Sequence, residues 1–322
     1  MEPRKTIGVV LFQLGGPDRL EAVEPFLYNL FCDPDIISFM GASLARKPLA
    51  KWIASRRSQI AKEHYAAIGG GSPIAELTNR QAAALSAALA PQIDAKVVVA
   101  MRYWHPLTQE AISQLGNSKL QQLVLLPLYP HYSFATTGSS LKEWQRLYRS
   151  NGLPVRMVND FHNHPSYIAA IVEKINETFA KAADPASLHI VFSAHGLPMS
   201  LVERGDPYPR QIQETVRLVL AAGAWKNPHT LCFQSRVGRQ KWLEPSLTNT
   251  IEALAKSGVA RLLVVPISFV TEHIETLHEI NIEAREEAER LGITEFLMMP
   301  SLNDSPTFIR ALADLTLKAI AG

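Results

Sequence analysis

Leu123-Val-Leu-Leu-Pro-Leu-Tyr129 and Leu262-Leu-Val-Val-Pro-Ile-Ser268 decide the fold, because each is an apolar run that ends in proline and opens into a polar loop. Runs of this length and composition are typical of buried strands. Each run is followed by a longer amphipathic segment, which is the alternation expected of a parallel sheet with crossover helices. The similarity of the two runs predicts that the halves of the chain are copies of one unit.

Six further apolar runs extend this pattern, three in each half. The strands predicted in this way are Ile7–Leu14, Val97–Met101, Gln122–Leu128, Val155–Val158, Leu188–Ala194, Thr230–Phe233, Arg261–Ile267 and Phe296–Met299. We therefore expect an α/β protein with two similar doubly wound domains, each a parallel sheet flanked by helices. The predicted domains are residues 1–160 and 161–305, with a linker near residues 159–165. A last helix, residues 306–322, is expected to pack back on the first domain.

Composition narrows the class of protein. The chain has 322 residues, 47% of them hydrophobic, which is enough for a large core. A formal net charge of +2 argues against a nucleic-acid partner. Cys32 and Cys232 stand far apart, which excludes a disulfide framework or zinc ribbon and fits a reducing compartment. Because no signal sequence or membrane-length apolar run is present, we expect a cytoplasmic protein.

Clustered carboxylates and imidazoles follow the strand at 261–267. If a helix begins at Thr271, then Glu272, Glu275, Glu279 and Glu283 lie along one face of it. Such a stripe could carry protons or cations toward a pocket. The alternative is a solvated acidic face, balanced by nearby arginines.

A second cluster favours the functional interpretation. The run at 188–194 delivers His195 at its carboxyl end, just before Gly196. Ligands of open α/β sheets bind outside the carboxyl ends of strands, so His195 and the carboxylates are predicted to share one edge. A lone histidine at a strand end is otherwise more often a hydrogen-bonding loop residue than a catalyst.

Other turns favour a flat, apolar ligand over a nucleotide. Gly15-Gly16-Pro17 lacks the spacing of a dinucleotide loop, and neither a Walker motif nor a serine nucleophile elbow is present. Aromatic residues follow the strands that end near Arg102 and Tyr129, and such side chains suit a large planar ligand. Arg102, Arg56 or Arg57 could pair with acidic groups of that ligand. The alternative is that these aromatic residues belong to the edge of the core.

Taken together, the motifs resemble those of the ferrochelatase family. They are Gln13-Leu-Gly-Gly-Pro17, Gly69-Gly-Gly-Ser-Pro-Ile74, Arg102-Tyr-x-His-Pro106, Tyr129-Pro-x-Tyr-Ser133, Thr136-Thr-Gly-Ser-Ser-Leu141, Ser193-Ala-His-Gly-Leu-Pro198, Arg204-Gly-Asp-Pro-Tyr-Pro209, Gln234-Ser-Arg-Val-Gly238 and His273-Ile-Glu-Thr-Leu277. The resemblance covers nearly the whole chain and implies two Rossmann-like (chelatase-type) domains around a porphyrin cleft. It also implies a lyase that inserts Fe(II) into protoporphyrin IX, releasing two protons, as the last step of haem biosynthesis.

The resemblance assigns roles by position. His195 and Glu275 would be the catalytic pair, and the resemblance does not say which is base and which is metal ligand. Iron would be bound by His195, Glu275, Glu279 and Glu283, with Glu272 and His273 supporting proton or metal transfer. The porphyrin contacts implied are Leu14, Arg57, Tyr65, Ser72, Arg102, Tyr129, Trp242 and Phe269.

One departure from animal relatives bears on the expected cofactors. The chain lacks the carboxyl-terminal cysteines of animal relatives, and Phe134 occupies the place of a further cluster ligand, so no iron–sulfur cluster or other cofactor is expected. Residues 36–57 look like a basic amphipathic lip, for which reversible membrane contact and packing on the core are the alternatives. A monomer is expected rather than a homodimer.

The sequence is also compatible with other functions. The substrate could be coproporphyrin III or another tetrapyrrole of class II chelatases, and the lip favours protoporphyrin. A haem or tetrapyrrole carrier is the non-enzymatic alternative, although a carrier has no need for His195 beside Glu275.

Overall fold

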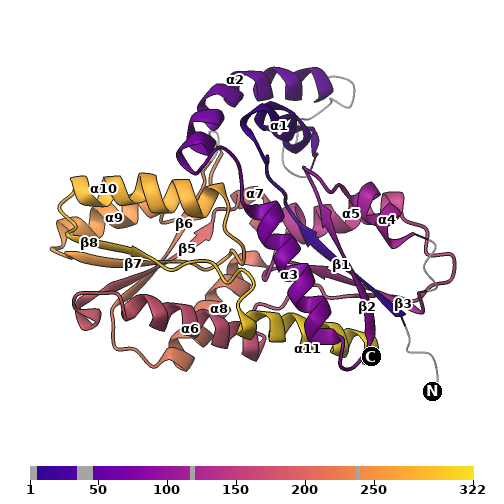
Figure 1. Ribbon diagram of the computed structural model, residues 1–322. Coiled ribbons are helices and arrows are strands. Elements are labelled where there is room, and N and C mark those ends of the chain that lie inside the picture. The colour runs from indigo at the N-terminus through magenta and orange to yellow at the C-terminus, as the bar shows by residue number, and fades with distance from the viewer. Residues whose placement is uncertain (1–5, 35–45, 117–119, 237–239) are drawn as a thin grey trace. The chain divides into compact units, whose positions relative to one another are not determined.

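The computed structural model describes residues 6–34, 46–116, 120–236 and 240–322, and these residues form two compact units (Figure 1). The first unit comprises Met1–Tyr129, Ser133–Asn159 and Leu312–Gly322. The second comprises Pro130–Tyr132 and Asp160–Ala311. Each unit holds one four-stranded parallel sheet.

The sheet of the first unit has the strand order β2-β1-β3-β4. Its strands are β1 (Thr6–Gln13), β2 (Asp94–Met101), β3 (Gln122–Pro127) and β4 (Val155–Met157). The central strands β1 and β3 are buried along almost their whole length, which explains their uninterrupted apolar sequences. The edge strand β4 is exposed.

Helices of the first unit connect these strands. They are α1 (Val23–Cys32), α2 (Arg46–Ala67), α3 (Ile74–Leu89), α4 (Thr108–Leu115) and α5 (Ser139–Leu147), with a 3-10 turn at Leu20–Ala22 and a π-helical turn at Phe134–Gly138. Helix α5 buries its apolar face against the sheet, where the Trp144 ring meets the Phe12 ring edge-on at 5.7 Å.

The sheet of the second unit repeats this topology, with the order β6-β5-β7-β8. Its strands are β5 (His189–His195), β6 (His229–Gln234), β7 (Arg261–Pro266) and β8 (Glu295–Met298). Its helices are α6 (Pro165–Phe179), α7 (Met199–Glu203), α8 (Tyr208–Gly223), α9 (Leu247–Lys256) and α10 (Arg285–Arg290), with a 3-10 turn at Pro185–Ser187 and a π-helix at Glu275–Ala284. Helix α11 (Pro306–Ala321) ends the chain and has residues in both units.

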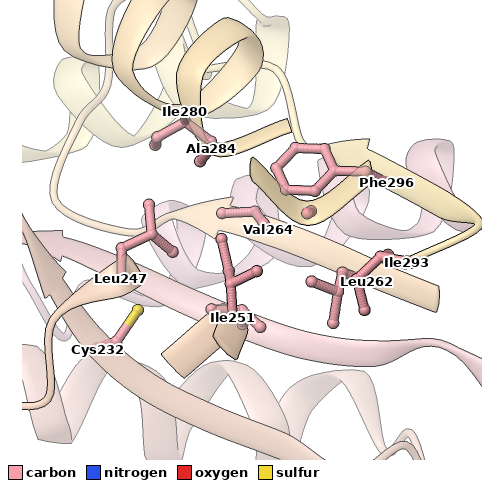
Figure 2. Close-up of a cluster of buried hydrophobic side chains, with 11 residues drawn as sticks. Cys232, Leu247, Ile251, Leu262, Val264, Ile280, Ala284, Ile293 and Phe296 are labelled. Carbon is pink, nitrogen blue, oxygen red and sulfur yellow. The ribbon is translucent and has the colours of Figure 1, made fainter. Parts of the chain in front are cut away.

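One apolar cluster fixes the π-helix and α9 on the sheet of the second unit (Figure 2). Ile251 of α9, Val264 of β7 and Ile280 of the π-helix are fully buried in it. Because Ile280 lies within the π-helix, this packing also fixes the direction of the carboxylates on that helix.

The predicted fold and internal repeat are confirmed. Strands β3 and β7, which contain the two similar runs, take the same place in their sheets. Each is followed by a loop, a π-helical segment and an α-helix, α5 and α10 respectively. The eight predicted strands are all present, with their ends shifted by up to three residues.

Candidate active site

His195 is the last residue of β5, and its backbone is fixed on both sides. Its N–H donates to Ser268 Oγ at 2.9 Å, and its carbonyl accepts a 3.0 Å bond from the Tyr208 hydroxyl. Gly196 follows and lies so close to Gln234 and Trp242 that a Cβ atom there would stand 2.7 Å from the Gln234 carbonyl oxygen. The glycine therefore lets β5 turn beside the end of β6.

The imidazole of His195 pairs with the first carboxylate of the π-helix. His195 Nδ1 lies 2.8 Å from Glu275 Oε2, and the His195 side chain remains 37% exposed. An ionised carboxylate only accepts hydrogen bonds, so Nδ1 carries the proton and Nε2 is the nitrogen left to act. Across the described ranges of the chain, no protein group pairs with Nε2.

A second histidine approaches the same carboxylate. His273 Nε2 lies 3.7 Å from Glu275 Oε2, while its Nδ1 is 3.0 Å from the carbonyl oxygen of Thr271. A carbonyl accepts only, so Nδ1 of His273 is also protonated. The Phe269 ring stacks edge-on against His273 at 4.5 Å and lies 6.2 Å from the His195 ring. Phe269 thus forms an apolar wall beside both imidazoles.

The charges of this cluster set its protonation. Burial lowers the pKa of His195, but the negative charges of Glu275 and Glu279 outweigh it, and the pKa lies above its ordinary value. Burial raises the pKa of Glu275, but the charges and hydrogen bonds of His195 and His273 hold it well below the usual range. Near neutral pH the site therefore combines a stable carboxylate with an imidazole whose protonated form is stabilised.

Glu279 is held by residues at the end of β6. Its carboxylate accepts from the Ser235 N–H at 2.6 Å, the Ser235 hydroxyl at 2.5 Å and Gln234 Nε2 at 3.3 Å. The pKa of Glu279 is raised because burial and the charge of Glu275 outweigh these donors and His195. Gln234 also donates to the Glu275 carbonyl at 3.1 Å and accepts from Ser193 at 2.7 Å. A single amide thus links β5, β6 and the π-helix.

The prediction that Glu272 shares a helical face with Glu275, Glu279 and Glu283 is wrong. The π-helix begins at Glu275 and not at Thr271. Glu272 lies before it, where its carboxylate accepts from the Ser301 N–H at 2.8 Å and from the Thr276 hydroxyl. Glu272 therefore ties the first turn of the π-helix, through the Thr276 side chain, to the backbone of Ser301 after β8.

The remaining carboxylates are spread along the wider turn of the π-helix. Glu279 is four residues from Glu275 and lies close enough to His195 to affect its pKa. Glu283, a further four residues on, has a side chain that is 50% exposed and lies 3.6 Å from Nδ1 of His278. π-Helices are rare and are frequently found at functional sites.

In the first unit, the predicted porphyrin contacts Leu14, Arg102 and Tyr129 all follow the carboxyl ends of strands. The Arg102 N–H donates to the Gln13 carbonyl at 2.9 Å, so the ends of β1 and β2 are joined. Arg102 is near enough to Tyr129 for its charge to affect the pKa of that hydroxyl, which burial raises above its ordinary value. This unit therefore places the three residues along one sheet edge.

The other predicted contacts of the first unit lie around α2. Tyr65 and Ser72 are buried, with 4% and 8% exposure. The Ser72 N–H donates to the Pro17 carbonyl at 2.7 Å, which places it beside the turn after β1. The Arg57 guanidinium lies 5.7 Å from the Phe31 ring.

Trp242, the remaining predicted contact, lies in the second unit beside His195. It forms an isolated bridge with Pro198, and its ring carbon Cε3 would lie 3.2 Å from a Cβ atom at Gly196. Trp242 and Phe269 therefore both belong to the surroundings of His195.

Sequence reasoning assigned no site role to Gln234, Ser235 or Tyr208. All three stand in motifs that the sequence did single out, Tyr208 in the motif at 204–209 and the other two in the motif at 234–238. Ser235 has a positive φ of 63°, and its N–H donates to Glu279. Residues 36–45 of the predicted lip and Gly238 lie outside the described residues. Of the lip, the structure describes helix α2 from Arg46 onward.

Comparisons with known proteins identify the family of this chain. The family model described as Ferrochelatase matches residues 6–320. The chain is 46% identical to the ferrochelatase of Synechococcus sp. (strain RCC307), over 98% of this chain and 83% of that one. It is also 46% identical to the ferrochelatase of Gloeobacter violaceus, over 97% of each.

Solved structures with the same fold are more distant in sequence. SirB from Bacillus subtilis, solved with Fe3+, matches with a TM-score of 0.58 at 11% identity, over 98% of this chain and 96% of that one. CbiX, described as the terminal enzyme of siroheme biosynthesis in denitrifying bacteria, matches with a TM-score of 0.53 at 15% identity, over 98% and 99%. At these identities the likeness concerns the fold alone.

Proposed function

The chain belongs to the ferrochelatase family and inserts iron into a porphyrin, and we propose that its substrates are protoporphyrin IX and Fe(II). The observation that carries the proposed site is the 2.8 Å pair of His195 and Glu275, with Nε2 of His195 left open. Metal insertion removes two pyrrole N–H protons while a divalent cation loses water and enters the ring. The site must therefore supply a base and transient metal ligands.

We propose that His195 accepts a pyrrole proton at Nε2. Glu275 keeps the proton on Nδ1 and stabilises the imidazolium that forms, so proton transfer and charge compensation occur in one pair. The pKa of His195 fits this role, because the charges of Glu275 and Glu279 outweigh the effect of burial, raise that pKa and so strengthen the imidazole as a proton acceptor.

We propose that Glu275 and Glu279 are transient oxygen ligands of the substrate iron, with Glu283 at the exposed end of the path. Glu279 is already bound to Ser235 and Gln234, which weakens it as a ligand and favours release of the cation. His273 supports Glu275 through its 3.7 Å contact, and Glu272 supports the site by fixing the start of the π-helix. Because insertion changes no oxidation state, we propose that no resident cofactor or iron–sulfur cluster is needed.

We propose that the porphyrin contacts Leu14, Arg57, Tyr65, Ser72, Arg102, Tyr129, Trp242 and Phe269. Aromatic and apolar groups supply the flat surface, and arginines pair with the carboxylates of the porphyrin. The choice of protoporphyrin over coproporphyrin rests on the lip, which includes the first part of α2 up to Arg57 and which relatives acting on coproporphyrin largely lack.

We propose that the enzyme is cytoplasmic and monomeric. We also propose that α2 makes reversible contact with a membrane surface. Trp52 and Ile60 of α2 are 57% and 60% exposed, and the Arg56 guanidinium lies 4.9 Å from the Trp52 ring. Exposed apolar side chains among basic ones suit the surface of an anionic bilayer. In the described part of the chain, no helix has the length and apolarity needed to cross a membrane. Co-sedimentation with anionic vesicles tests this, and equal binding by wild type and Trp52→Ser/Ile60→Ser would contradict it.

Anaerobic insertion assays test the catalytic proposal. Fe(II) and either protoporphyrin or coproporphyrin would be supplied to the wild type, His195→Ala and Glu275→Gln. We expect turnover with protoporphyrin, and a loss of at least about 10²-fold in kcat for each variant. His162→Ala is the matched control, because His162 also pairs with carboxylates, Asp160 at 2.7 Å and Glu214 at 3.1 Å, but lies outside the site.

The outcomes separate the parts of the proposal. Unchanged kcat in His195→Ala would refute the site assignment, and preferred turnover of coproporphyrin would refute the substrate. A loss in His162→Ala equal to that in His195→Ala would show that the effect arises from a general loss of structure.

A further inference from the structure

Asp33 is a buried carboxylate at the carboxyl end of α1 that takes no part in the proposed catalytic step. Its side chain is 1% exposed, and three donors converge on Oδ2. They are Arg102 Nη2 at 2.8 Å, the Tyr103 hydroxyl at 2.6 Å and the Ser139 hydroxyl at 2.6 Å. Burial and the charge of Asp33 raise the pKa of Tyr103, so its hydroxyl keeps its proton and remains a donor.

The Arg102 guanidinium is held by this network on two of its three nitrogens. Nη2 binds Asp33, and Nε donates to the Ser139 hydroxyl at 2.9 Å. The face of the guanidinium lies 4.9 Å from the centre of the Tyr103 ring. Within the described residues the third nitrogen, Nη1, has no partner, and the side chain is 18% exposed.

The backbone places this guanidinium at the carboxyl edge of the sheet. The N–H groups of Arg102 and Tyr103 donate to the carbonyls of Gln13 and Leu14, at 2.9 and 3.0 Å, and so join the ends of β1 and β2. Ser139 begins α5 and thus links the same point to the loop after β3. One nitrogen is therefore presented at an edge where three strand ends meet.

We propose that Asp33 and Ser139 are positioning residues that hold Arg102 so that its free Nη1 binds a carboxylate of the porphyrin. The inference rests on the proposed function, in which Arg102 contacts the porphyrin. A free arginine must lose side-chain entropy when it binds a ligand, and a preorganised one has already lost it on folding.

Two effects of Asp33 oppose each other. Its charge neutralises part of the attraction of Arg102 for a ligand carboxylate, and its hydrogen bond fixes the geometry. Without Asp33 the guanidinium would turn toward solvent, where water screens its charge and little attraction is gained. The loss of geometry therefore dominates, and removing either positioning residue weakens binding.

Fluorescence titration of metal-free protoporphyrin tests the proposal without the chemical step. We expect Kd to rise roughly tenfold or more in Arg102→Met, about tenfold in Asp33→Asn and about threefold in Ser139→Ala, which leaves every charge in place. Protoporphyrin dimethyl ester, which has no free carboxylate, should bind all variants with nearly equal Kd. Thr78→Ala removes a buried hydroxyl of α3, bound to the Ile74 carbonyl at 2.6 Å, and controls for a loss of stability.

A mutant cycle shows whether the residues act through Arg102. In the neutral background Asp33→Asn/Arg102→Met, which leaves no buried charge unpaired, Ser139→Ala should no longer change Kd. A threefold effect that persists in this background would overturn the positioning role. An unchanged Kd in Arg102→Met would refute Arg102 as a porphyrin contact. If Kd rises in Arg102→Met but stays unchanged in Asp33→Asn and Ser139→Ala, only the inference about positioning is refuted.

Discussion

Replacing Gly196 with alanine would place a methyl group where β5 turns beside the end of β6. The new Cβ would stand 2.7 Å from the Gln234 carbonyl oxygen and 3.2 Å from Cε3 of Trp242. A backbone oxygen cannot rotate away as a side chain can, so the strand ends must separate by about 0.7 Å to reach the 3.4 Å of ordinary contact. The same movement stretches the 2.7 Å bond from the Gly196 N–H to that oxygen.

This separation would displace the residue that links the strands to the π-helix. Gln234 contacts Ser193, the Glu275 carbonyl and Glu279. A shift of several tenths of an ångström at such a residue should lower kcat/KM for iron insertion roughly tenfold to hundredfold. The overpacking itself should lower the free energy of unfolding by about 1–3 kcal/mol.

The assay compares the wild type with Gly196→Ala and Gly258→Ala in iron insertion and in urea unfolding. Gly258 follows α9 and has a φ of +85°, and no atom lies within 4 Å of the position that a Cβ atom would take there, so its substitution strains only the backbone. That strain costs about 1–2 kcal/mol and should leave turnover unchanged. Full turnover in Gly196→Ala, or an equal loss in both variants, would refute the reasoning.

Three further predictions concern other parts of the second unit. Ile251→Ala creates a cavity in the cluster of Figure 2 and should lower the free energy of unfolding, measured in urea, by about 2–5 kcal/mol. A smaller loss would show that the neighbouring side chains move in to fill the cavity. Burial lowers the pKa of His162, but Asp160 and Glu214 raise it above its ordinary value. Protonated His162 therefore stabilises the folded state. This stabilisation is complete at pH below about 6.5 and is lost as the pH rises through the raised pKa. Melting curves should accordingly show the largest deficit of His162→Gln against wild type at acidic pH, and a deficit that grows with pH would contradict the pairing. Glu272→Gln weakens the hydrogen bonds that tie the start of the π-helix to Ser301, and it should cost about 1–3 kcal/mol of stability. It should change kcat much less than Glu275→Gln does, and equal kcat losses in the two variants would contradict the separation of their roles.

Much of the fold could be predicted because its signals are local. Strands buried on both faces, such as β3 and β7, must be apolar along their length, and that pattern can be counted in the sequence. The repeat of the same run in each half predicted that the halves are copies of one unit, and the two sheets do share one strand order. That His195 and the carboxylates after β7 share one edge could be predicted, because the carboxyl ends of parallel strands meet there, whereas the choice of Glu275 as the partner of His195 came from the resemblance to ferrochelatases.

The start of the π-helix could not be predicted in the same way. Spacing placed Glu272 on a stripe with the other carboxylates, because residues three and four apart share a helical face only if the helix includes them all. Whether it does depends on Ser301, which is distant in the sequence and whose N–H takes the Glu272 carboxylate out of the stripe.

The sequence by itself determined which residues form strands, how the two halves repeat and which residue types stand at the strand ends. Tertiary structure alone decided that Asp33 reaches Arg102 and Ser139, and that Gln234 joins β5 to the π-helix. The physical reason is range. Burial patterns act on each segment separately, whereas a hydrogen bond between distant segments exists only after the packing of their elements has brought donor and acceptor within about 3 Å.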